Sequence, residues 1–544
     1  MTDTGTEPET DLVDPSTPFV LLSLANDQPE PLVAEDFLAK VSAALMYLSR
    51  DGDQRTFLEK PGAIEMAINV YRKTCTCLDT RQMDAEDQAQ HKQIQTTFIS
   101  TLADLSAQPS FNLLCPIDEP LARTLQTWIR GPSSQLQSAA CLMLGNIARS
   151  DEVCKRLVHH SAIHDHLVAI LRDKENADAI HLHCVLSFLK NLAIPQENKL
   201  IVGNSGLLDA DMLPRIWDID TQPQVQFAAV SLCRLLLLGC SPNVRRVCAP
   251  LQVDEPKSEL ENRPSSPTSS VTLGARRNSG RTALHGLLDL NARSDYEPVQ
   301  MESARAVAAV CRSLHTYRDA HRLGQDPDLA SRFLPTYYSL EFSSSSHDSP
   351  DAALAAFYQH HPTIADVMAS LAIQTKFPAL RAEVFLIFSI MARTRSGFGV
   401  IARAVHKREF AAAIEAVAGG KGKEEHTNTA VDNGAENQVS TSSTSTALPL
   451  KEVRSNALAF IATILRECPD ENTDEEGQGN VLPSDVRQTF EKLLQESGRE
   501  ILREQGGRQS GKGKDTEGID EESIWVKADE DPHKQRSRCN QGAS

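Results

Sequence analysis

The sequence predicts an all-α fold, a right-handed superhelical solenoid of the armadillo or HEAT type that carries disordered insertions. Strand patterns are almost absent, and apolar residues instead recur with helical spacing in segments such as Ser138–Ala148 and Gln226–Leu237. These segments are apolar on most sides, which is typical of helices that pack between neighbours. The predicted helical pattern also repeats every 42–45 residues, a period typical of armadillo and HEAT units.

One column of residues keeps the register of this repeat. Asn146 in LGNIAR and Asn191 in LKNLAI align 45 residues apart, and Tyr47, Asp104 and Arg234 occupy the same column in other copies. Insertions lengthen the spacing towards the C-terminus, where the pattern is weaker. The weaker copies are Glu302–Ser313, Arg381–Arg393 and Arg454–Arg466.

A second column follows the first by 15 or 16 residues and holds Gly62, Ala162 and Gly206. Small residues suit a sharp turn between two helices, because they tolerate backbone conformations that larger side chains resist. We therefore expect the chain to turn at this column in each copy before the next helix begins.

Composition divides the chain into repeat blocks and polar segments that bury too little apolar surface to offset the cost of ordering. The predicted segments are a disordered acidic N-terminus at 1–30, armadillo repeats at 31–253, a disordered Ser/Pro/Arg linker at 254–281, armadillo repeats at 282–418, a disordered linker at 419–447, a C-terminal armadillo repeat at 448–504 and a disordered tail at 505–544.

Charge and hydropathy exclude several classes of protein. The formal net charge is −18, which disfavours binding to nucleic acid and favours basic partners. The longest apolar runs, such as Val384–Ala392, fall short of the ~18 residues that a transmembrane segment needs. The twelve cysteines lie mostly in apolar helical text, as reduced core thiols do. We expect a cytoplasmic protein, with a nuclear or organelle association through a partner left open.

No motif for covalent chemistry stands out. GGKGK at Gly419–Lys423 lacks the spacing and the preceding strand of a phosphate-binding loop. Histidines cluster at 159, 160, 164, 166, 181 and 183 without a completing ligand pair, so polar surface positions explain them better than a metal site. We therefore predict no catalytic residue, no metal and no cofactor. Ser266 and Ser279 match short kinase patterns and are weak candidates for phosphorylation.

Two roles are open for the asparagines of the repeat column. Asn disfavours helix interiors unless its side chain forms specific bonds. In an armadillo array, an Asn on the third helix of a repeat can bind the backbone of a segment lying in the concave groove. Alternatively, it can bind the backbone of the neighbouring repeat. The sequence supports contact with a bound segment and bonding to the neighbouring repeat about equally.

Four strings in the repeats resemble the small G-protein GDP-dissociation stimulator family. They are LGNIARSDEVC from Leu144, LKNLAIPQENK from Leu189, PQVQFAAVSLCRLL from Pro223 and ESARAVAAVCR from Glu302, and EVRSN from Glu452 is a looser fifth. The resemblance covers roughly residues 121–503. The linkers at 254–281 and 419–446 have no counterpart in the family that we recognise.

The resemblance implies an armadillo solenoid that binds small GTPases of the Rho, Rap and Ras groups and favours their nucleotide-free form. It further implies nucleotide exchange and a chaperone-like grip on GTPases with polybasic, prenylated tails. We expect a monomer that acts by binding and is not an enzyme. The resemblance and the repeat column together indicate six groove contacts: Asn146, Asn191, Arg305, Arg312, Glu383 and Asn456.

Alternative functions remain. An importin-like adaptor would carry Trp four residues before each groove Asn, but Leu142 and Ser187 stand there. A catenin-like or vacuolar armadillo scaffold would hold its partners without exchange activity. An enzyme would need a nucleophile–base pair, paired carboxylates or a metal set, and the sequence offers none of these.

Overall fold

A computed structural model describes residues 14–29, 32–49, 51–76, 84–175, 178–209, 211–249, 281–322, 350–420, 447–468 and 482–509. Within these ranges the regular secondary structure is helical, and no strand occurs. The predicted all-α solenoid is confirmed. Contacts divide the chain into two units, Met1–Ser484 and Asp485–Ser544, and the second contains nearly all of helix α25 (Ser484–Gln509).

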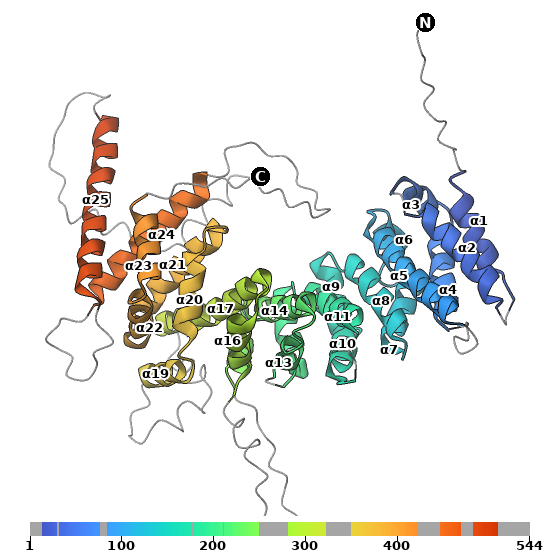
Figure 1. Cartoon of the computed structure of the whole chain (residues 1–544), viewed down its shortest axis with the longest axis horizontal. Helices are drawn as coiled ribbons and strands as arrows, with labels where there is room; N and C mark the ends of the chain where they lie inside the picture. The colour runs from blue at the N-terminus through green and yellow to red at the C-terminus, as the bar shows by residue number, and fades with distance from the viewer. Residues whose placement is uncertain are drawn as a thin grey trace, which may run out of the picture. The chain divides into compact units, whose positions relative to one another are not determined.

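One row of mostly long helices runs through the first unit, with each helix packed against the next (Figure 1). We call it the central row. These helices are apolar on most sides because each touches a neighbour before it, a neighbour after it and the outer helices. The central row consists of α2 (Ala34–Tyr47), α5 (Ala85–Ala107), α8 (Ser134–Ile147), α11 (Ala179–Leu192), α14 (Pro223–Leu237), α17 (Glu297–Arg322), α21 (Pro378–Ala392) and α24 (Ala447–Arg466).

Two further helices precede each central helix from α5 onward, so that the unit of the array is a three-helix repeat of armadillo type. The second helices are α1 (Thr17–Asn26), α4 (Ala63–Thr76), α7 (Pro120–Arg130), α10 (Ile163–Arg172), α13 (Leu213–Trp217), α16 (Ala283–Arg293), α20 (Ile364–Ile373) and α23 (Arg408–Ala418). The first helices are α3 (Asp51–Leu58), α6 (Phe111–Leu114), α9 (Asp151–His159), α12 (Gln196–Val202) with the π-helical η2 (Gly203–Leu207), α15 (Ser241–Val247), α19 (Pro350–His360) and α22 (Arg395–Val405). Within the described residues, the pair α1–α2 has no first helix.

Local sequence signals explain where these helices begin. Proline occupies an opening position of α7, α14 and α21, where its fixed φ suits a helix and its missing N–H costs no bond. Ser133 caps α8 and Asp178 caps α11, each accepting a backbone N–H from the first turn with its side-chain oxygen. The repeat is therefore set by start signals as well as by apolar spacing.

The turn column predicted from the sequence is confirmed. Gly62 (φ 75°), Ala162 (φ 47°) and Gly206 (φ 88°) all have left-handed backbones. Ala162 is the one non-glycine residue with positive φ among the described residues, and it directly precedes α10. Alanine in this conformation is strained by about 1–2 kcal/mol, because its Cβ crowds the following carbonyl.

Replacing Ala162 with glycine is expected to raise the free energy of unfolding by about 0.5–1 kcal/mol. Relief of the left-handed strain exceeds the extra freedom that glycine gains in the unfolded chain. Urea denaturation followed by circular dichroism measures the change. Gly62→Ala is the matched control, because its added Cβ would meet nothing within 4 Å and its φ of 75° would still disfavour alanine. It should lose about 1 kcal/mol, and a loss for Ala162→Gly would contradict this account.

The predicted disordered segments have mixed outcomes. The prediction for 1–30 is wrong in part, because α1 occupies Thr17–Asn26 and buries Leu22 and Ala25 against its neighbours. Its apolar run TPFVLLSLA is long enough to pack, which the acidic residues around it obscured. Residues 250–280, 421–446 and 510–544 lie outside the described residues, as do 323–349 in the central block. Helix α25 continues to Gln509, past the predicted start of the tail. The other boundaries stay predictions.

Candidate functional site

The asparagines of the repeat column bind the preceding repeat. Asn146 on α8 donates its Nδ2 to the carbonyl of Ala103 at 3.1 Å, and Asn191 on α11 donates to the carbonyl of Gly145 at 3.0 Å. Asn456 on α24 donates in the same way to the carbonyl of Ala382 at 3.0 Å. For Asn146 and Asn191 the acceptor lies one residue before the column residue of the neighbouring central helix, Asp104 and Asn146 respectively.

These bonds bear on the two roles left open for the asparagines. Each Nδ2 is engaged within the array, so all three asparagines have the structural role. Asn146 also donates to Ser106 Oγ at 2.9 Å and accepts from Arg149 at 3.4 Å. All three side chains are only half-buried, so contact between their Oδ1 atoms and a partner stays a proposal.

A buried carboxylate joins α14 to α17. Glu302 has a side chain that is 6 % exposed, and two guanidinium groups hold it. Arg234 Nε on α14 lies 2.5 Å from Glu302 Oε1, and Arg305 Nη1 lies 3.0 Å from Oε2. A buried charge is tolerated when it is paired in this way. The paired carboxylate in turn fixes the position of both arginines.

A second ion pair joins α17 to α21. Arg312 Nη1 on α17 donates to Glu383 Oε1 on α21 at 2.9 Å, and both side chains are more than two-fifths exposed. Arg305, Arg234 and Glu383 also line one small pocket of about 20 Å³ between α14, α17 and α21. We call the five residues Arg234, Glu302, Arg305, Arg312 and Glu383 the charged groove. Its formal charge is +1 in a chain of −18.

Apolar side chains complete this pocket. Leu238, Leu380, Val384 and Ile387 line it together with two alanines of α17. Lys199 lies behind Leu238 and donates its Nζ to the carbonyl of that residue at 2.7 Å. Burial lowers the pKa of Lys199. Because arginine and apolar side chains line the same pocket, the charged groove can offer guanidinium donors to acidic groups on a partner, with apolar contact beside them.

The structure gathers four of the six predicted site residues. Arg305, Arg312 and Glu383 belong to the charged groove, and Asn456 binds the backbone residue next to Glu383. Asn146 and Asn191 lie further along the central row, on the adjacent helices α8 and α11. Contact of these six residues with another protein stays a proposal. Ser266 and Ser279 lie outside the described residues.

Sequence reasoning missed a buried polar column. Cys154, Asn198 and Asn243 stand 44 and 45 residues apart in α9, α12 and α15. Asn198 donates to the carbonyl of Leu192 at 2.7 Å, and Asn243 donates to that of Leu236 at 2.9 Å. Each bond links the C-terminal end of a central helix to the first helix of the following repeat. The regular spacing was the signal that could have revealed the column.

Sequence reasoning also left Glu302 and Arg234 out of the site. Glu302 opens an alanine-rich stretch of mostly apolar residues, which indicates a charge on a packed face. Within the described residues, no three His, Cys, Asp or Glu side chains gather in a way that could hold a metal ion. None of the described helices is long and apolar enough to cross a membrane.

Comparison with known proteins finds similarity over part of the chain. No family model matches the chain. The GTPase-GDP dissociation stimulator vimar from Drosophila melanogaster is 27 % identical over 204 residues, which are 37 % of this chain and 30 % of the relative. The Rap1 GTPase-GDP dissociation stimulators 1-B and 1-A from Xenopus laevis are both 31 % identical, over 113 and 111 residues. The chain resembles GTPase-GDP dissociation stimulators.

This similarity confirms the resemblance seen in the repeat strings. It extends over part of each protein only, since the Xenopus matches cover 20 % of this chain and 18 % of the relatives. The matched stretches thus span less than a third of the curated relatives. Among solved structures, an engineered protein aligns with 88 % of the chain at 16 % identity and a TM-score of 0.43.

Proposed function

We propose that this protein stimulates the release of GDP from a small GTPase of the Rho, Rap or Ras groups. The similarity to proteins named GTPase-GDP dissociation stimulators is the observation that carries the proposal. Such a protein acts by binding and needs no covalent chemistry. It accelerates release only if it binds the open, nucleotide-free form of the GTPase more tightly than the GDP-bound form.

The charged groove supports this proposal as the contact surface. Arg305 and Arg312 lie seven residues apart on α17, two helical turns, so they share one face of the helix. Glu302 and Glu383 hold their guanidinium groups in place before any partner arrives. Pre-organised donors lose less conformational entropy on binding than mobile side chains do. They would meet acidic groups near the nucleotide site of the GTPase.

The charge of the whole chain supports a second contact. A net charge of −18 favours attraction to the polybasic tail that many small GTPases carry, and steering of this kind weakens as salt screens it. A chaperone-like grip on a prenylated tail belongs to the same proposal. The predicted cytoplasmic location fits such partners.

A scaffold without exchange activity is the second candidate. The hydrogen-bonded Asn column favours it, because amides engaged within the array are less available to a partner in the groove. A pull-down against a GTPase panel separates the two candidates. It should compare GDP-loaded, GTP-loaded and nucleotide-free forms, with and without prenylation. An exchange factor retains the nucleotide-free form preferentially, whereas a scaffold retains all forms equally.

An Arg305→Ala/Arg312→Ala variant should slow the stimulated release of GDP about tenfold, because arginine anchors often dominate binding energy. Its melting temperature should change little. Arg312 belongs to an exposed ion pair worth about 0–1 kcal/mol, and Glu302 keeps Arg234 as a partner when Arg305 is lost. Arg408→Ala on α23 is the matched control for an exposed arginine outside the groove. Equal rates for the double variant and the wild type would remove the groove from the proposal.

A further inference from the structure

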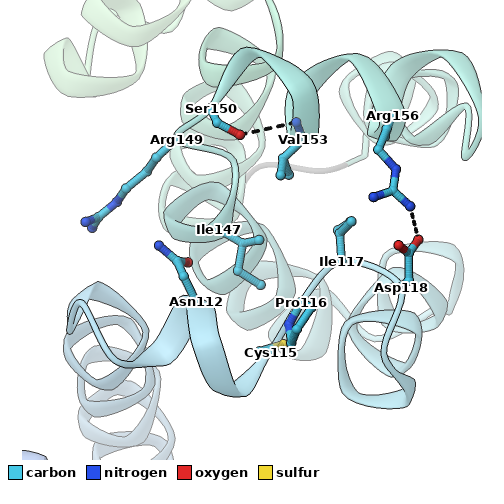
Figure 2. A pocket seen from close by; sticks show the side chains of 10 residues that line it. All are labelled: Asn112, Cys115, Pro116, Ile117, Asp118, Ile147, Arg149, Ser150, Val153 and Arg156. Atoms are coloured by element: carbon cyan, nitrogen blue, oxygen red, sulfur yellow. Dashed lines mark hydrogen bonds and ion pairs between the residues drawn. The ribbon is translucent and has the colours of Figure 1, made fainter.

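A second pocket lies between the first helices of neighbouring repeats, away from the charged groove. It encloses about 400 Å³ where the loop between α6 and α7 meets the turn from α8 into α9. Its lining consists of apolar side chains, charged side chains and the two neutral polar residues Asn112 and Ser150 (Figure 2). No part of the proposed nucleotide exchange uses it.

The apolar part of the lining forms a floor. Ile117, Ile147 and Val153 come from three different segments and surround the same space, with Cys115 and Pro116 beneath them (Figure 2). Cys115 and Ile147 are buried, whereas Val153 is half-buried. An apolar floor of this kind can accept a bulky side chain from outside, since filling it removes apolar surface from water.

Two exposed leucines lie beside the pocket. Leu113 and Leu114 on α6 directly precede Cys115, and they are 82 % and 43 % exposed. An isolated exposed leucine is ordinary, but two in sequence next to an open apolar pocket enlarge the surface that a partner could cover. The pocket and this pair together make a place for an extended segment rather than for a small molecule.

The charged part of the lining is basic. Arg149 and Arg156 stand on opposite sides of the pocket, and Asp118 pairs with Arg156 (Figure 2). Arg149 is exposed and makes one long contact, with Asn146 Oδ1 at 3.4 Å. In the part of the chain that the structure describes, no carboxylate lies within ion-pair distance of Arg149. Among the described residues, a guanidinium group without an ion-pair partner thus borders the apolar floor of a strongly acidic protein.

We infer that this pocket binds a short linear segment of a partner protein, in which a bulky apolar side chain stands next to aspartate or glutamate. The apolar side chain enters the floor formed by Ile117, Ile147 and Val153. The neighbouring carboxylate pairs with Arg149, which has no ion-pair partner among the described carboxylates of this chain. The net charge of −18 repels an acidic segment from most of the protein surface. Arg149 therefore also determines where such a segment docks.

Fluorescence polarisation with two labelled hexapeptides tests this inference on the full chain. One peptide carries Leu-Phe at its centre with two aspartates on each side, and the other carries lysines instead of aspartates. The acidic peptide should bind with a dissociation constant of about 10–100 μM, at least tenfold more tightly than the basic one. Arg149→Glu should weaken the acidic peptide at least tenfold and strengthen the basic one. Val153→Trp should weaken the acidic peptide by filling the floor.

Arg408→Glu on α23 is the control, because it reverses an exposed charge outside the pocket and should change neither affinity. Arg149→Glu changes an exposed side chain, so it tests the pocket even if Val153→Trp fails to fold. The inference is overturned if the acidic peptide shows no saturable binding, if both peptides bind equally, or if Arg149→Glu leaves the acidic peptide unaffected.

Discussion

Replacing Gly203 with alanine is expected to lower the free energy of unfolding by about 3 kcal/mol. An added Cβ would lie 2.0 Å from Asn243 Oδ1 and 2.7 Å from its Nδ2, closer than such atoms can approach. Asn243 is fully buried, and its Nδ2 donates to the carbonyls of Leu236 and Lys199, both at 2.9 Å. Displacing the amide breaks both bonds inside the core, and each loss costs about 1–3 kcal/mol.

Two comparisons isolate this cause. Gly498→Ala makes the same change where a Cβ would meet nothing within 4 Å, so it should leave stability unchanged or slightly raised. In an Asn243→Ala background the clash is gone, and Gly203→Ala should then cost less than about 1 kcal/mol. Urea denaturation of the four variants gives the free energies. An equal cost in both backgrounds would show that Asn243 is not the obstacle.

Acidification below pH 6.5 is expected to destabilise the fold through a histidine cluster between α16 and α19. Burial lowers the pKa of His361 to about 3, and burial with the neighbouring His360 lowers that of His285 to about 4. His285 Nδ1 accepts the backbone N–H of Thr282, and its Nε2 lies 3.2 Å from the carbonyl of His360, so the neutral ring completes a capping box. Protonation of Nδ1 would remove that acceptor.

The direction of the stability change follows from the linkage between folding and proton binding. Both histidines bind a proton near pH 6.5 when unfolded but resist it when folded, so their full stabilisation is present above 6.5 and is lost as the pH falls towards 4 and 3. At pH 5, His361 should cost about 2 kcal/mol relative to pH 7.5. His285 adds less because its ring is only partly buried.

Denaturation midpoints measured between pH 4.5 and 7.5 check this expectation. The His285→Gln/His361→Gln variant should show a flatter pH profile than the wild type, even if its stability at pH 7.5 is lower. His183→Gln is the control, because His183 is exposed on α11. A double variant that loses stability with acid as steeply as the wild type would exclude the cluster as the cause.

The repeat architecture could be predicted from the sequence because its signals are local. Helical spacing, helix start residues and the turn column at Gly62, Ala162 and Gly206 are each set within a few residues of chain. The helix α1 was missed because a short apolar run stands inside an acidic segment. Its packing against α2 and α4 depends on neighbours that its own composition does not reveal.

The bonds of the candidate residues could not be predicted from the sequence, and their role as a binding site stays a proposal. Asn146 and Asn191 were found through periodicity, yet their acceptors lie 43 and 46 residues upstream, so only the packed row reveals the bonds. Glu302 and Arg234 meet across 68 residues of sequence, including residues outside the described part of the chain. No local pattern marks such a pair. Arg312 and Glu383, 71 residues apart, were predicted singly and not as partners.

The rate of fluorescent GDP release from a panel of Rho, Rap and Ras GTPases tests the central claim most directly. The assay should use low salt and both prenylated and unprenylated GTPases, because electrostatic attraction weakens with screening. The proposal predicts faster release from at least one GTPase, and slower stimulated release for the Arg305→Ala/Arg312→Ala variant than for Arg408→Ala. Unchanged release from every GTPase, prenylated or not, would contradict exchange activity and leave the scaffold as the function.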